Sequence, residues 1–96
     1  MSFIYDHPTE DVKFVTPSHG FLRVERAKLQ QMGILADITP FSHQSPDGRF
    51  IFLEEDDDQI TYAIAVGPTY RDRRQRMRIV LDNNDVISEL PGFSHT

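Results

Sequence analysis

The chain has 96 residues, with 10 Lys and Arg against 15 Asp and Glu, and a formal net charge of −5 at pH 7. This length predicts one domain, 1–96, and the charge argues against the overall basic field typical of nucleic-acid-binding proteins. The absence of cysteine excludes disulfides, thiol catalysis and cysteine-bound metal clusters. No apolar run approaches the roughly 18 residues of a membrane span, and no signal peptide is evident, so we expect a cytoplasmic protein with no membrane partner.

The N-terminal third is predicted to hold an arm, two strands and a helix. Residues 1–11 show no hydrophobic period, and we expect them to form an arm whose apolar tip docks on the rest of the chain. Residues 12–15 and 21–24 are short β-prone runs, separated by Thr-Pro and Gly. Residues 25–32 are strong helix formers, and Gly33 stands where a C-terminal cap belongs.

The middle of the chain contains the clearest hairpin pattern. Residues 38–45 and 49–53 are rich in β-branched and aromatic side chains, and Pro46-Asp47-Gly48 between them has the composition of a tight turn. The second run places apolar residues on both faces of the strand. We therefore expect it to be central in its sheet.

The segment 60–66 fits two structures. As a helix, it would have Asp57 or Asp58 as N-cap, acidic residues at the positive end of the dipole, and Gly67-Pro68 as its stop. As a strand, it would alternate Ile, Tyr, Ile and Val. We favour the helix because the cap, dipole and stop agree.

The C-terminal part begins with the polar, Arg-rich segment 69–75. A strand is predicted at 77–81, followed by a turn at 82–85 into 86–87, which together indicate a second hairpin, and 91–96 has the composition of a tail. The whole pattern predicts an α+β fold, with a small, mostly antiparallel sheet of four to six strands and one or two short helices on one face.

Five consecutive carboxylates form the first candidate site: Glu54, Glu55, Asp56, Asp57 and Asp58. They could dock a basic partner, imitate a phosphate backbone, or bind a divalent cation. The run lacks the alternation and the glycine of a calcium loop. A solvated junction between a strand end and a helix N-terminus would also explain it. We take the run as the candidate binding site for a basic protein partner.

A basic segment opposes the acidic run. It holds half of all Lys and Arg and begins with an aromatic residue. Its members are Tyr70, Arg71, Arg73, Arg74, Arg76 and Arg78. Guanidinium groups bind phosphates and Tyr70 could stack on a base, so single-stranded nucleic acid is one partner for it. The segment could instead pair with 54–58, within one chain or across a symmetric dimer, or form a solvated loop.

Catalytic and metal-binding patterns are absent from the sequence. Ser18 precedes His19, but sequence neighbours rarely face each other as nucleophile and base. His7, His19, His43 and His95 are scattered without zinc-site spacing, and no phosphate-binding glycine loop occurs. We expect no enzymatic activity, no cofactor and no metal.

Two segments, Pro17-Ser18-His19-Gly20-Phe21-Leu22-Arg23-Val24 and Phe52-Leu53-Glu54-Glu55-Asp56-Asp57-Asp58, resemble a pattern in short uncharacterised proteins of bacteria, phages and plasmids. The resemblance covers less than half of the chain and carries no catalytic residue. It implies a dedicated binder, such as a phage or mobile-element inhibitor of a host defence or nucleic-acid-handling protein. We therefore expect a small acidic, non-enzymatic binding protein that forms a homodimer and engages a basic macromolecular surface. The alternative is a nucleic-acid-binding regulator that uses Arg71–Arg78.

Overall fold

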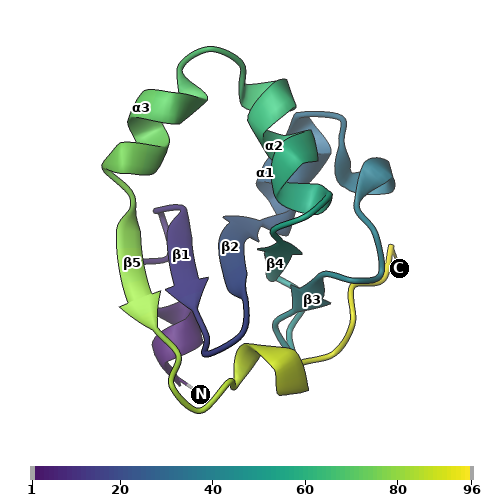
Figure 1. Ribbon diagram of the computed structural model, residues 1–96. Helices are drawn as coiled ribbons and strands as arrows, with labels where there is room; N and C mark the ends of the chain where they lie inside the picture. The colour runs from purple at the N-terminus through teal and green to yellow at the C-terminus, as the bar shows by residue number, and fades with distance from the viewer. Residues whose placement is uncertain (1, 96) are drawn as a thin grey trace.

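The computed structural model describes residues 2–95, and its centre is a five-stranded sheet (Figure 1). The strands are β1 (Val12–Val15), β2 (Gly20–Glu25), β3 (His43–Gln44), β4 (Phe50–Glu54) and β5 (Arg78–Leu81). Their order is β3-β4-β2-β1-β5, and every neighbouring pair is antiparallel except β1 and β5, which run parallel. The predicted α+β class and mostly antiparallel sheet are confirmed.

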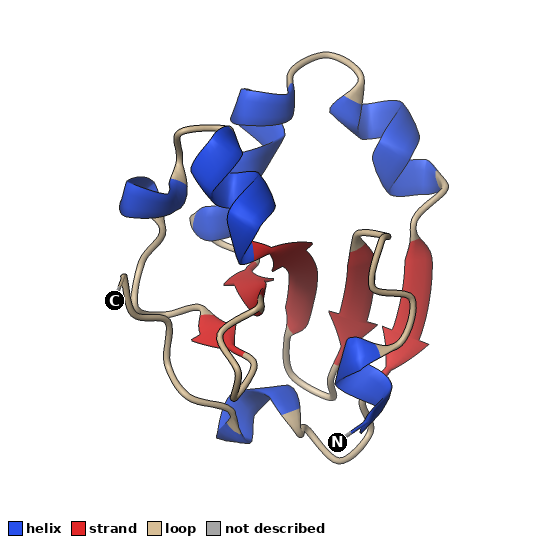
Figure 2. Cartoon of the chain, turned by 180° about the vertical axis from the view of Figure 1, so that it is seen from behind, coloured by secondary structure: helices blue, strands red, loops and turns tan. Residues whose placement is uncertain are grey.

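Short helices surround the sheet. The α-helices are α1 (Arg26–Gln31), α2 (Asp58–Val66) and α3 (Tyr70–Gln75), and the 3₁₀ helices are η1 (Ser2–Tyr5), η2 (Leu35–Asp37) and η3 (Ile87–Glu89). Both views place the α-helices toward one end of the sheet, and η1 and η3 toward the other (Figure 2). The helices at 25–32 and 60–66 are confirmed. The third helix, α3, forms from the polar segment, whose composition alone predicted no element.

Two apolar clusters pack on opposite faces of the sheet, and β4 contributes to both. Phe50 and Phe52 enter one cluster with Ile4 of the arm, and Ile51 and Leu53 enter the other with Leu29 and Tyr62 of the helices. All four of these β4 side chains have 0% exposure. The prediction of an interior strand with two apolar faces is confirmed, since β4 lies between β3 and β2.

The first strand of the predicted hairpin is much shorter than 38–45. Only His43 and Gln44 pair with β4, although Gly48 adopts the positive φ of +75° that the turn prediction requires. Pro40 cannot donate a hydrogen bond to a ladder, and the Thr39 N–H binds the Asp58 carboxylate instead. Residues 39–42 are therefore a loop that faces the start of α2.

The predicted second hairpin is wrong. β5 pairs with β1 in parallel, and the chain does not return beside β5. The Asp82 carboxylate accepts the N–H groups of Val86 and Ile87, both at 2.9 Å. This side-chain cap directs the chain into η3, and so 86–87 form no strand.

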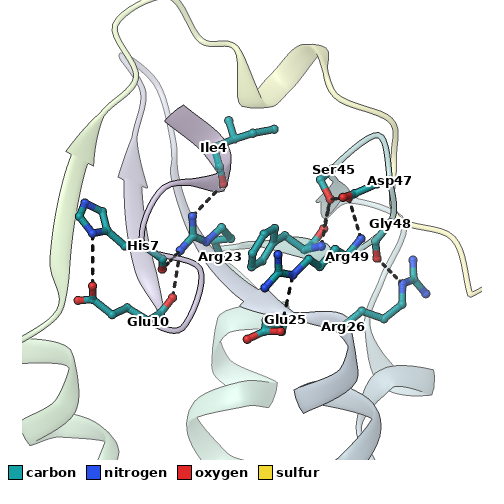
Figure 3. Close-up of polar contacts among 11 residues, drawn as sticks. Ile4, His7, Glu10, Arg23, Glu25, Arg26, Ser45, Asp47, Gly48 and Arg49 are labelled. Carbon is teal, nitrogen blue, oxygen red and sulfur yellow. Dashed lines mark hydrogen bonds and ion pairs between the residues drawn. The ribbon is translucent and has the colours of Figure 1, made fainter. Parts of the chain in front are cut away.

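A buried arginine fixes the described part, 2–11, of the predicted arm, 1–11 (Figure 3), and Met1 lies outside the described residues. Arg23 of β2 has 0% exposure, and its guanidinium lies 4.6 Å from the centre of the Phe50 ring. Burial lowers the Arg23 pKa from its ordinary value. Its acceptors are the carbonyl oxygens of Ile4, Asp6, His7 and Glu10, at 2.6–3.1 Å. The apolar tip of the arm docks as expected, with Ile4 in the core.

The predicted tail, 91–96, is packed over its described part. Phe93 is 5% exposed, its N–H binds the Ser42 carbonyl oxygen at 2.8 Å, and Gly92 forms a β-bridge with His43. Thr96 lies outside the described residues. Over residues 2–95, no helix has the length and apolar character needed to cross a bilayer.

Candidate functional site

The acidic run connects β4 to α2 and forms a turn, which we name the acidic turn (Glu54–Asp58). Its first carboxylate is used inside the turn. The Glu54 side chain accepts the backbone N–H of Asp56 at 2.8 Å and those of Asp57 and Asp58 at 2.7 Å. The first N–H groups of a helix have no partner within the helix. Glu54 therefore caps α2 and holds the backbone of the turn in one conformation.

The last carboxylate of the acidic turn is buried. Asp58 has 0% exposure. It accepts the Thr39 N–H at 3.0 Å and the Thr39 hydroxyl at 2.8 Å, and it also accepts the Ser42 hydroxyl. Ser42 Oγ in turn accepts the Glu54 N–H at 3.0 Å. This network fixes the 39–42 loop against the acidic turn.

A hollow of about 390 Å³ lies between these fixed segments. Glu55, Asp56 and Asp57 line it and are exposed, and Glu54 lines it as well. Phe41, from the 39–42 loop, also lines the hollow and is 75% exposed. An exposed aromatic ring thus lines the same hollow as three carboxylates that accept none of the hydrogen bonds described above.

Aromatic and imidazole rings form another part of the lining. Phe21 is 4% exposed, and the rings of His19 and His43 meet it edge-on, with centroids 6.1 and 5.6 Å away. His43 Nδ1 lies 2.9 Å from the Leu90 carbonyl oxygen and so donates its proton there. Across residues 2–95, no group of three or more His, Asp or Glu side chains is placed to hold a metal ion.

The structure separates the five carboxylates predicted as a binding site into two groups. Glu54 and Asp58 are taken up by internal hydrogen bonds, and a partner can reach Glu55, Asp56 and Asp57. Phe41 was missed, because it was placed in a predicted strand. Pro40 was the sequence signal that this part of the strand would be interrupted.

The Arg-rich segment lies on α3 and the start of β5, with all five arginines exposed. Arg73 pairs with Asp11 at 3.5 Å, and Arg78 with Glu10 at 3.4 Å. Among residues 2–95, no ion pair joins this segment to the acidic turn. Arg74 does line a second hollow, of about 290 Å³, together with Glu55 and Asp56, so the two charge clusters flank one depression without touching.

Tyr70 does not stand free beside the arginines. Its ring packs edge-on against Tyr62, with centroids 5.9 Å apart and an interplanar angle of 85°. Burial raises the Tyr70 pKa. The half-buried ring packs against the apolar cluster that contains Tyr62, and it also lines the 290 Å³ hollow beside Arg74.

Comparison of the chain with protein-family models, with curated proteins and with solved structures finds no match. The resemblance noted in 17–24 and 52–58 stays a prediction. These two segments contain most of β2 and most of β4, which pair with each other in the sheet. Both also supply lining residues of the 390 Å³ hollow, His19, Gly20 and Phe21 from one and Glu54–Asp57 from the other.

Proposed function

We propose that this protein is a non-enzymatic binding protein that receives a Lys or Arg side chain of a basic protein partner in the hollow between the acidic turn and Phe41. The observation that carries the proposal is the pairing of three exposed carboxylates with a 75% exposed phenylalanine around one cavity. A large exposed aromatic ring beside a hollow is typical of an interaction site.

The chemistry of the hollow matches such a side chain in two ways. Glu55, Asp56 and Asp57 provide the negative charge that attracts a cation and raises the rate of encounter. Phe41 provides an aromatic face for the aliphatic stem or the cationic head, an interaction of about 0.5–1 kcal/mol at an exposed site. Glu54 already fixes the acidic turn, and Asp58 already fixes the 39–42 loop. Binding therefore costs little additional conformational entropy of the backbone.

The placement of the two resembling segments supports the same function. Residues of 17–24 and of 52–58 line this hollow together, which is what we would expect if the resemblance of these segments to short proteins of phages and plasmids reflects a shared binding surface. We infer that the partner is a basic, nucleic-acid-handling or defence protein of a host cell, and that the encounter takes place in the cytoplasm.

The test uses a short fluorescent peptide of alternating Arg and Gly, with a citrulline counterpart as the neutral control. We expect the Arg peptide to bind, and Asp56→Lys with Asp57→Lys to weaken it about tenfold or more. Asp37→Lys with Asp72→Lys is the matched control: both residues are exposed, neither lines the hollow, and the net charge change is the same. Equal weakening by both pairs would contradict a local site.

A second candidate function, nucleic-acid binding, rests on Arg71, Arg74 and Arg76. They are exposed, and no ion pair within residues 2–95 neutralises them. For a phosphate-binding surface, the logarithm of the binding constant should fall linearly with the logarithm of the salt concentration. Absence of binding to a single-stranded oligonucleotide at low salt removes this candidate, and binding that Arg74→Ser abolishes would place it ahead of the first.

A further inference from the structure

The outer edge of β5 is open. β5 is the last strand of the sheet, and in both overall views no described segment runs along its outer side (Figures 1 and 2). Open edges of this kind are templates for pairing with another strand, and proteins usually protect them with proline, an inward-pointing charge or a bulge. Arg78 begins β5 with an exposed charge, but Ile79, Val80 and Leu81, which follow it, carry none of these protections.

The backbone groups that face outward belong to Ile79 and Leu81. The Asp82 N–H binds the Val15 carbonyl oxygen at 2.7 Å, and β5 is in parallel register with β1. Alternation along a ladder then directs the backbone of Val80 toward β1, and that of Ile79 and Leu81 toward the open edge. Each of these two residues presents one donor and one acceptor there.

The same two residues expose their side chains. Ile79 is 63% and Leu81 is 67% exposed. Their register partners on β1 are Lys13 and Val15, which point to the face opposite to the buried Val12 and Phe14. An apolar surface and an unpaired backbone edge therefore coincide on one strand.

Charge is distributed unequally along this strand. The exposed Arg71, Arg73, Arg74 and Arg76 precede β5, whereas no Lys or Arg follows Arg78. After the strand, Asp82 is buried as a cap, and the accessible acidic side chains are those of Asp85 and Glu89. One end of the edge is thus basic and the other acidic. If two copies of β5 paired in parallel, like ends would meet. Antiparallel pairing brings each basic end to the acidic end of the other copy.

We propose that the occupant of this edge is a second copy of the chain, and that two β5 strands pair antiparallel about a twofold axis at Val80. In this register, the outward N–H and C=O groups of Ile79 pair with those of Leu81 of the partner subunit. The same groups of Leu81 pair with those of Ile79 of the partner subunit. It also gathers the four exposed apolar side chains on one face of a continuous ten-stranded sheet. None of Ile79, Val80 and Leu81 lines the hollow between the acidic turn and Phe41, so the paired residues are not part of that site.

Size-exclusion chromatography with light scattering over a dilution series tests the proposal. We expect the wild-type protein to have the molar mass of two chains. The double variant Ile79→Lys with Leu81→Lys should have half that molar mass, which is the mass of the monomer. Ile60→Lys with Ile64→Lys is the matched control, since both isoleucines are exposed, on α2, and we expect it to remain dimeric. A wild type that is monomeric at every concentration overturns the proposal, as does a control that dissociates while the β5 variant does not.

A cysteine substitution tests the register independently of the lysine variants. The natural chain has no cysteine, so Val80→Cys carries a single thiol. Across a twofold axis at this position the two residues form a non-hydrogen-bonded pair with Cα atoms about 4.5 Å apart, within the range that a disulfide spans. We expect oxidation to give a covalent dimer for Val80→Cys and not for Ile64→Cys. Equal or faster cross-linking through Cys at 64 contradicts the register.

Discussion

The acidic turn and the Arg-rich segment carry similar numbers of charges but are held in different ways. Two of five carboxylates in the acidic turn are used inside the fold, where Glu54 caps α2 and Asp58 binds the 39–42 loop. All five arginines are exposed, and α3 is anchored through the packing of Tyr70 on Tyr62. In the acidic turn, two of the carboxylates thus order the backbone segments that line the hollow together with the other three.

The largest expected effect comes from removing the buried carboxylate of the acidic turn. Asp58→Ala leaves Thr39 and Ser42 without their acceptor, and we expect the free energy of unfolding to fall by about 3 kcal/mol. Asp57→Ala, its exposed neighbour, should change it by less than about 0.5 kcal/mol. Urea denaturation of both variants measures the difference, and similar small changes would show that the network does not hold the turn.

The anchor of the Arg-rich segment should respond to alkaline pH. Burial, and for Tyr62 also its hydrogen bond to Asp11, raises the pKa of Tyr62 and Tyr70 in the folded chain, whereas the unfolded value is near 10. The folded state therefore binds more protons above about pH 10. Stability is complete below that pH and falls as pH rises toward the folded pKa values.

Thermal unfolding followed by circular dichroism from about pH 8 to about pH 11 checks this prediction. We expect Tyr62→Phe to have a lower melting temperature at pH 8, because it loses the bond to Asp11, but a smaller decline above about pH 10. An unchanged alkaline slope in Tyr62→Phe would mean that other groups cause the decline.

The smallest effect is expected from the arginines themselves. Arg71→Ser with Arg74→Ser removes two exposed charges that make no ion pair within residues 2–95, and the free energy of unfolding should change by less than about 0.5 kcal/mol. The Arg peptide should bind this variant at least as tightly as the wild type, because repulsion near the acidic turn decreases. Weaker binding would indicate that the arginines belong to the site.

Local patterns predicted most of the fold. Helix formers before Gly33, the stop at Gly67-Pro68 and the turn glycine Gly48 each depend on a few neighbouring residues. The parallel pairing of β1 with β5 joins residues far apart in sequence, and no local pattern encodes it. The contacts of Arg23 could not be predicted either. Its acceptors are backbone carbonyl oxygens, which every residue has, so the side chains of the arm give no sign of them.

The candidate site was predictable as a concentration of charge but not as a cavity. Composition identified the five carboxylates at 54–58, and it could not say which would be buried. That division depends on Thr39 and Ser42, which lie 19 and 16 residues from Asp58. The role of Phe41 depends on the same long-range network, since Asp58 fixes the loop that exposes its ring.

The most direct test of the central claim is a map of peptide binding on the protein by amide NMR. Titration with the Arg peptide should shift the amide signals of Phe41, Glu55, Asp56 and Asp57, and Phe41→Ala should weaken binding about threefold, as expected for an exposed cation–π contact. The citrulline peptide should cause no such shifts. Shifts spread evenly over the surface, or confined to residues outside the hollow, would contradict the account.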